Sequence, residues 1–249
     1  MKYILILLVI ISQLIAKDTK QEVTIGAGAY LQTQPYKNTD AILLPSPVIF
    51  FDNSIVYVRW TRAGIYFLGD KQDNYSWGFS LTIQPRPYGY LSSDSKNLAG
   101  MDERKTSFEG GLAFSTKLEK TYFEIMALTD ILDRHDSWLI KAELGDDFKI
   151  GNFSFYPSII AIYNSAKFMD YYYGVKNSEV ITDLRPAYKA DAGLQFGAQT
   201  YISYPLTDNV SAFINLRVDR LPQEATNSPI VSDDFIYSGL ASLIYTFQY

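Results

Sequence analysis

Apolar and polar residues alternate with a period of two through most of this chain, most clearly at its C-terminal end. From Phe235 to Tyr249 every second residue belongs to a set rich in aromatics, and the residues between them form a mixed set. Successive side chains of a β-strand point to opposite faces, so this segment is predicted to be a strand with two unlike faces. Residues 189–204 and 209–219 repeat the pattern. The alternation predicts an all-β protein.

Twelve segments carry this pattern, and most are about ten residues long, the length of a tilted strand that crosses a bilayer. The segments are 22–32, 43–51, 55–68, 75–85, 107–116, 121–130, 137–145, 153–163, 168–174, 189–204, 209–219 and 234–248. Segments 43–51 and 153–163 contain proline, which cannot donate to a strand ladder, so ten strands are the alternative. An even number returns both termini to the periplasm, as single-chain bacterial barrels require.

The links between these segments predict which end of a barrel each one faces. Short turns are periplasmic in outer-membrane barrels and longer links face outside. The short polar links are 52–54, 134–136 and 207–209, and the longer ones are about 34–42, 69–74, 174–188 and 221–232. Residues 86–106 fit poorly, because this long segment falls on the periplasmic side when twelve strands are counted.

The N-terminal residues are typical of a signal peptide. Lys2 precedes an apolar run from Ile4 to Ile11, and Ala16 offers a small residue for cleavage. The run is too short to span a bilayer as a helix. We therefore expect a signal peptide at 1–16, cleaved near Ala16, and one domain at 17–249. Together with the aromatic strands, it predicts an antiparallel transmembrane β-barrel in a Gram-negative outer membrane.

Composition excludes several classes of function. The 249 residues include no Cys and one His, so disulfides, thiolate metal sites, Cys nucleophiles and His-rich zinc sites are excluded. The net charge of −5 gives no basic footprint for nucleic acid. No phosphate-binding loop or Gly-x-Ser-x-Gly motif is present. We expect neither a cofactor nor a catalytic site.

Charged residues within the alternating segments are predicted to face the lumen, because Arg or Lys on the lipid face near mid-membrane costs ~2–4 kcal/mol. These candidates are Glu109, Glu124, Lys141, Glu143, Lys189, Asp191, Arg217 and Asp219. They could select solutes as a charged constriction. They could instead pair with one another and fill a small barrel, and the spacing of Lys189 with Asp191 and of Arg217 with Asp219 favours pairing.

Two other groups of side chains suggest weaker hypotheses. His135 and Ser137 could form the pair of a lipid hydrolase, but a solvated turn is the simpler interpretation. The carboxylate pairs Asp146–Asp147 and Asp233–Asp234 could bridge lipopolysaccharide through divalent cations.

An ordered series of short sequence motifs in the last third of the chain resembles the motifs of a known family. It begins with Asp170-Tyr171-Tyr172-Tyr173-Gly174 and Arg185-Pro186-Ala187-Tyr188, continues with Tyr204-Pro205-Leu206-Thr207, and ends with Ala225-Thr226-Asn227-Ser228-Pro229 and Tyr245-Thr246-Phe247. Leu98-Ala99-Gly100-Met101-Asp102 and Leu44-Pro45-Ser46-Pro47 add earlier motifs. Over nearly all of 22–249 the chain is similar to the MipA/OmpV family of MltA-interacting outer-membrane proteins.

The resemblance implies a barrel without enzymatic activity that acts as a scaffold, holding a periplasmic murein hydrolase near a peptidoglycan synthase. Other members are porin-like, so a narrow channel for small polar solutes is the alternative. The expected partners also include outer-membrane lipid, lipopolysaccharide and the barrel-assembly machinery, and we expect a monomer. The assembly signal would be the C-terminal residues Leu243, Tyr245, Phe247 and Tyr249, where Tyr replaces the usual terminal Phe.

Overall fold

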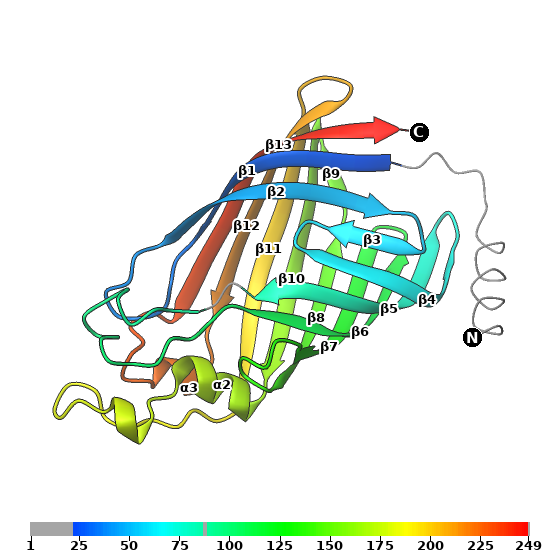
Figure 1. The fold of residues 1–249 in the computed structure, drawn as a ribbon. Coiled ribbons are helices and arrows are strands. Elements are labelled where there is room, and N and C mark those ends of the chain that lie inside the picture. Colours follow the sequence, from blue (N-terminus) through cyan, green and yellow to red (C-terminus); the bar gives the residue numbers. More distant parts are fainter. Residues whose placement is uncertain (1–21, 87–88, 249) are drawn as a thin grey trace.

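The computed structural model describes residues 22–86 and 89–248, and these form one antiparallel β-barrel with twelve strands in its wall (Figure 1). The strands are β1 (Glu22–Gln32), β2 (Ile42–Asp52), β3 (Val56–Arg59), β4 (Arg62–Lys71), β5 (Tyr75–Arg86), β6 (Ser107–Leu118), β7 (Thr121–Asp130), β8 (Trp138–Asp146), β10 (Phe153–Asn164), β11 (Gly193–Pro205), β12 (Val210–Arg220) and β13 (Phe235–Gln248). Pairing of β1 with β13 and of β10 with β11 closes the ring. The short β9 (Phe148–Ile150) continues β8 and pairs only with β10 among the described strands. The prediction of a twelve-stranded barrel is confirmed.

The alternation places apolar side chains outside and a mixed set inside. On β13, Leu243, Tyr245 and Phe247 are 57%, 40% and 45% exposed, whereas the intervening Leu240 and Ile244 are buried. A membrane barrel needs this apolar outer band because lipid offers no partner for polar groups. Of the predicted assembly signal, Tyr249 lies outside the described residues, as does the predicted signal peptide.

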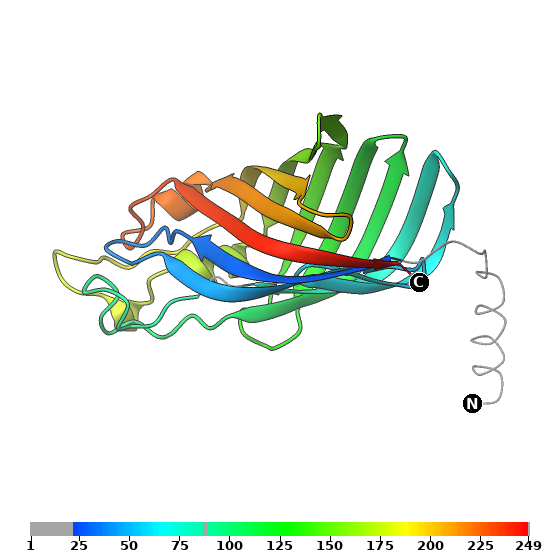
Figure 2. The ribbon, with the colours of Figure 1, turned by 90° about the horizontal axis from the view of Figure 1, so that it is seen from above.

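Both termini of the described barrel lie at one end of the wall, which we call the terminus end (Figures 1 and 2). Its turns are short: 53–55, 72–74, 119–120, 147–152 and 206–209. The opposite loop end carries the longer connections 33–41, 87–106, 131–137, 165–192 and 221–234. The predictions that 86–106 and 134–136 share an end with 52–54 and 207–209 are therefore wrong, and 69–74 is no long outer link.

Two mistaken strand assignments explain this error. The predicted strand 55–68 is the hairpin of β3 and β4, which turns at Trp60 and Thr61. The predicted strand 168–174 is the helix α2 (Ala166–Tyr173), whose buried residues Phe168, Met169, Tyr172 and Tyr173 follow helical spacing. The predicted number of strands is still twelve, because counting β3 and β4 as one strand removes one and counting α2 as a strand adds one. Between these two positions, every expected link fell on the wrong end.

The loop end is closed by its own connections. Buried Tyr36, Tyr90, Leu98 and Ile230 pack with α2 in one apolar cluster. The short helices η1 (Asn177–Glu179) and α3 (Gln223–Thr226) belong to the same layer. None of the helices in the described residues is long and apolar enough to cross a membrane. The barrel thus has a plugged end and an end of short turns.

Candidate functional site: the charged interior of the barrel

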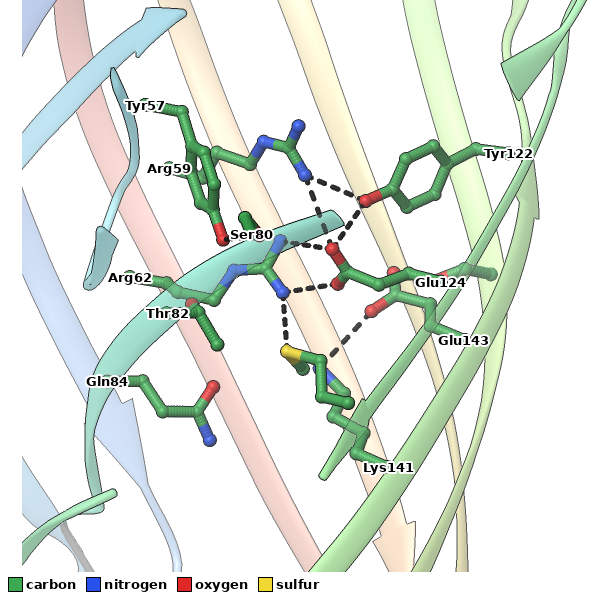
Figure 3. Close-up of polar contacts among 12 residues, drawn as sticks. Tyr57, Arg59, Arg62, Ser80, Thr82, Gln84, Tyr122, Glu124, Lys141 and Glu143 are labelled. Carbon is green, nitrogen blue, oxygen red and sulfur yellow. Dashed lines mark hydrogen bonds and ion pairs between the residues drawn. The ribbon is translucent and has the colours of Figure 1, made fainter. Parts of the chain in front are cut away.

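Inward positions on β3, β4 and β7 bring charged side chains together inside the wall, although β5 and β6 separate β4 from β7 in the sheet (Figure 3). Glu124 of β7 is 3% exposed and accepts hydrogen bonds from Arg62 of β4, with 2.8 Å between Arg62 Nη2 and Glu124 Oε1. Tyr122 donates to the same carboxylate at 2.7 Å. Arg59 of β3 donates to Tyr122 at 2.7 Å and lies 3.4 Å from Glu124. The alternation requires this placement, since outward charges would face lipid.

The network extends around the barrel in both directions. Toward the terminus end, Arg59 pairs with Asp52 at 3.2 Å and donates to Tyr66 at 2.7 Å. On β8, Lys141 Nζ lies 3.2 Å from Glu143, which also accepts from Ser158 of β10 at 2.9 Å and Gln199 of β11 at 2.7 Å. The interior therefore holds two sets of polar contacts, one from β2 to β7 and one from β8 to β11, which adjoin where Glu124 and Glu143 are in register.

Two further ion pairs lie inside the wall. Arg217 and Asp219 of β12 pair at 2.6 Å, and Gln195 of β11 donates to Asp219 at 2.9 Å. Nearer the loop end, Arg86 of β5 pairs with Glu109 of β6, which is fully buried. The Arg86 guanidinium also lies 4.6 Å above the Phe168 ring of α2, so this pair anchors the plug.

An apolar cluster fills another part of the interior. Val48, Phe213, Leu240 and Ile244 form a buried cluster, against which Trp60 and other aromatics pack. Phe213 and Tyr201 stack at 5.7 Å. Ion pairs and aromatic side chains therefore share the interior, and β12 carries both, with Phe213 and the Arg217–Asp219 pair on one strand.

Contacts between the long connections hold the plug in place. Arg104 donates to Glu179 at 3.0 Å and to the Tyr171 carbonyl oxygen at 2.6 Å. Arg185 donates to the carbonyl oxygens of Asn97 and Ala99 at 2.7 and 3.0 Å. All three ionic side chains are buried. Burial with several hydrogen bonds per charge is typical of a structural clamp rather than of a solvated binding surface.

The structure places six of the eight charged candidates inside the barrel, namely Glu109, Glu124, Lys141, Glu143, Arg217 and Asp219. Lys189 and Asp191 are exposed in the connection before β11, which begins at Gly193 rather than at residue 189, so their predicted lumen position is wrong. The alternating pattern did not identify Arg59, Arg62 and Arg86 as lumen residues, although Arg59 and Arg62 lie within a predicted strand. Their guanidiniums complete the network.

His135 is buried at the loop end and is not the solvated turn residue that the sequence suggested. Its Nδ1 lies 2.6 Å from Ser137 Oγ, and burial lowers the pKa of the imidazole below its ordinary value. The ring packs edge-on against Phe168 at 5.2 Å. Helix α2 thus covers the pair, and a lipid substrate would have no open approach to Ser137 in this arrangement.

Known proteins with similar sequences are outer-membrane proteins. The chain is 26% identical over 234 residues to the MltA-interacting protein of Escherichia coli (strain K12), covering 91% of this chain and 90% of that protein. It is 29% identical over 169 residues to the outer membrane protein Omp26La of Vibrio anguillarum, covering 66% and 63%. Among solved structures, the COG4313 outer membrane channel from Pseudomonas putida F1 matches with a TM-score of 0.48 and 12% identity, covering 93% and 97%.

The family model described as MltA-interacting protein MipA matches residues 25–247, which is almost the whole described barrel. The outer-membrane name of the Vibrio anguillarum relative agrees with the barrel topology and the apolar outer band. The chain therefore belongs to the MltA-interacting protein (MipA) family of outer-membrane β-barrel proteins.

Proposed function

We propose that the protein is a closed structural barrel that holds a periplasmic peptidoglycan-remodelling enzyme at the outer membrane. The observation that carries this proposal is the filled interior. The carboxylates of Glu109, Glu124 and Asp219 are each at most 3% exposed and each faces a guanidinium, so they offer little to a passing solute. A barrel whose interior is largely filled by paired side chains is suited to act through its ends. The name of the Escherichia coli relative, MltA-interacting protein, supports a murein hydrolase as the partner.

The terminus end is the docking surface that we propose, with this end facing the periplasm. Its longest turn is the β8–β10 connection with β9, where Ile150 is 63% exposed and Phe148 and Phe153 are 40% and 44% exposed. One edge of β9 has no strand neighbour among the described residues. Lys149 adds a charge between the two apolar side chains of β9. Such a group of exposed aromatic and aliphatic side chains is suited to insertion into a pocket on a partner protein.

Binding of a purified MltA-type lytic transglycosylase to the barrel in nanodiscs tests this function. We expect Ile150→Asp to weaken binding by about tenfold or more, because truncation of a central apolar anchor costs roughly 2 kcal/mol. Val180→Asp is the matched control, since Val180 is 41% exposed at the loop end. Wild-type protein that does not bind the enzyme, or equal weakening by both changes, would refute the proposal.

A narrow channel for small polar solutes is the second candidate, because charged side chains line the interior on several strands. Conductance of the refolded barrel in a planar bilayer separates the two functions. Ion-selective openings that change when Arg217 is replaced by Gln would favour the channel. A silent barrel that still migrates as a folded, heat-modifiable species would favour the adaptor.

A further inference from the structure

The barrel wall has a break in its strand pairing between β2 and β5. β2 pairs with β1 through residues 42–51, but it pairs with β3 only through 50–52. On the other side of the break, Gln84–Arg86 of β5 lie beyond the last β4–β5 pair, Ala63 with Ile83. Among the described residues no strand pairs with 42–48 on the side away from β1. In Figure 1 the β3–β4 hairpin ends between β2 and β5, and beyond it no strand lies between these two.

The β2 edge along this break is blocked against another strand. The Ile49 carbonyl oxygen accepts a hydrogen bond from the Trp60 amide at 2.8 Å, so it points away from β1. The odd-numbered residues of β2 before Ile49 therefore point their N–H and C=O groups toward the break. Two of those residues are Pro45 and Pro47, which have no N–H. Carbonyl oxygens therefore dominate this edge. A β-strand added here would find no N–H donor on β2 at these two positions.

The inner corner of the break is held by Trp60 at the hairpin tip. Trp60 has a φ of 58°, a left-handed conformation that is unfavourable for a bulky side chain. Its Nε1 donates to Ser46 Oγ of β2 at 2.9 Å, and its ring meets Tyr30 edge-on at 5.6 Å. Such a conformation persists only where the surroundings fix it. The hairpin therefore stops at a fixed position, and the break is a built feature of the wall.

Strand register and the exposed outward residues Leu43 and Ile49 of β2 together place the break beside the apolar outer band of the wall. Pro47 is in register with Ala27 and, through it, with Leu243 of β13, and Leu43 is in register with Leu31 and Gly239. Leu243 and Gly239 lie between two outward aromatic bands on β13, Phe235 with Tyr237 and Tyr245 with Phe247. Aromatic bands mark the two membrane interfaces. Of the carbonyl oxygens on this edge, that of Ile49 accepts from the Trp60 amide and that of Pro47 accepts from Ser46 Oγ at 3.3 Å. The carbonyl oxygens of Leu43 and Pro45 are the ones that need a partner at such a depth.

Exposure indicates that the break reaches the inner face of the wall. Leu44 has the inward parity of Val48 on β2, yet Leu44 is 48% exposed and Val48 is fully buried. Other inward apolar residues, such as Leu240, are also buried. Beside Leu44, the side chain of Ser46 adds a hydroxyl to the rim.

We propose that this break is a lateral portal that binds an amphiphile from the bilayer, with a hydrocarbon chain and a headgroup that donates hydrogen bonds, such as an alcohol or amine. The chain would lie along Leu43, Leu44 and the two prolines. The headgroup would donate to the carbonyl oxygens of the β2 edge. The prolines argue against a protein strand as the occupant. This inference is independent of the adaptor function, since it concerns the wall rather than the terminus end.

Single cysteines test the portal without background, because the chain has no native Cys. Leu44→Cys is compared in nanodiscs with Leu43→Cys, an outward position, and with Val48→Cys, an inward buried position. The reagents are a bilayer-dissolved pyrene maleimide and a charged, water-soluble maleimide. Access controls thiol reaction rates, so we expect Leu44→Cys to react with the pyrene reagent about as fast as Leu43→Cys and about tenfold faster than Val48→Cys. Heat-modifiable migration confirms that each variant is folded.

Reaction of Leu44→Cys with the charged reagent alone, or at the slow rate of Val48→Cys, would overturn the portal. The occupant is tested by protection with 1-dodecanol and with dodecane, which has no hydrogen-bond donor. We expect dodecanol to slow the labelling of Leu44→Cys by about tenfold and dodecane to have little effect, because only the alcohol satisfies the edge carbonyls. Equal protection by the two probes, or none by dodecanol, would refute the proposed ligand class.

Discussion

Replacing Glu124 by Gln tests whether the charged interior is a dry structural network. Glu124 is 3% exposed and pairs with Arg62, which is 12% exposed, and with Arg59, which is 28% exposed. Removing one partner of a buried pair typically costs about 3–5 kcal/mol, because the other charge stays buried without compensation. Arg59 adds little, since its partial exposure screens it and Asp52 remains nearby. We therefore expect the free energy of unfolding to fall by about 3–5 kcal/mol.

The assay is urea unfolding of the barrel refolded in lipid vesicles, with folded and unfolded protein separated by gel mobility. Glu119→Gln is the matched control, because Glu119 is exposed in the β6–β7 turn and the substitution is the same. The double variant Arg62→Met/Glu124→Gln should recover part of the loss, because it removes the uncompensated guanidinium. A loss below about 1 kcal/mol for Glu124→Gln would refute the reasoning, since it would equate these pairs with solvated surface pairs.

Three further predictions concern the plug, its histidine and the apolar side of the lumen. Glu179→Gln leaves the buried Arg104 without its carboxylate, so residues 165–192 should become sensitive to protease while the barrel keeps its heat-modifiable migration. Burial lowers the pKa of His135 in the folded protein. As the pH falls below about 6.5, the unfolded chain therefore binds the proton first, and the free energy of unfolding decreases. His135→Gln should flatten this pH dependence, measured by urea titrations at pH 5 to 8. Asp130, Glu109 and Arg86 also act on this imidazole. Phe213→Ala should lower the free energy of unfolding by about 3–5 kcal/mol through a cavity beside Tyr201, and a smaller loss than for Ala212→Gly would contradict the filled lumen.

The strands were predictable where alternation is uninterrupted and bounded by turn residues. β1 matches its predicted segment at both ends, because a two-faced strand in a membrane wall follows a strict period of two. The β3–β4 hairpin was missed because its turn, Trp60-Thr61, contains no Gly, Pro, Asn or Asp to signal it. The aromatic run Tyr171-Tyr172-Tyr173 favours a strand by composition, but the helical spacing of Phe168, Met169, Tyr172 and Tyr173 packs one face of a helix onto the barrel mouth.

The candidate site was partly predictable for the same reason. Parity along a strand gives the inward face, so Glu124 and Glu143 could be assigned to the lumen from their own segments. Their partners come from strands far away in sequence. Gln199 and Glu143 are 56 residues apart, and Arg104 and Glu179 are 75 residues apart. No local pattern encodes which inward cation meets which inward carboxylate, or that buried Arg104 and Arg185 join two long loops.

The seam between β1 and β13 has a consequence for the order of assembly. Thr24 meets Thr246 at 2.9 Å across 222 residues of sequence, and Gln248 donates to Glu22 at 2.8 Å across 226 residues. β1 is synthesised and exported first, yet its partner on this side is delivered last. Contacts of such long sequence separation form slowly because closing the intervening loop is entropically unfavourable. One edge of β1 must therefore be protected from premature pairing until the final strand arrives, and the speed of this last ring-closing step should limit how fast the barrel matures.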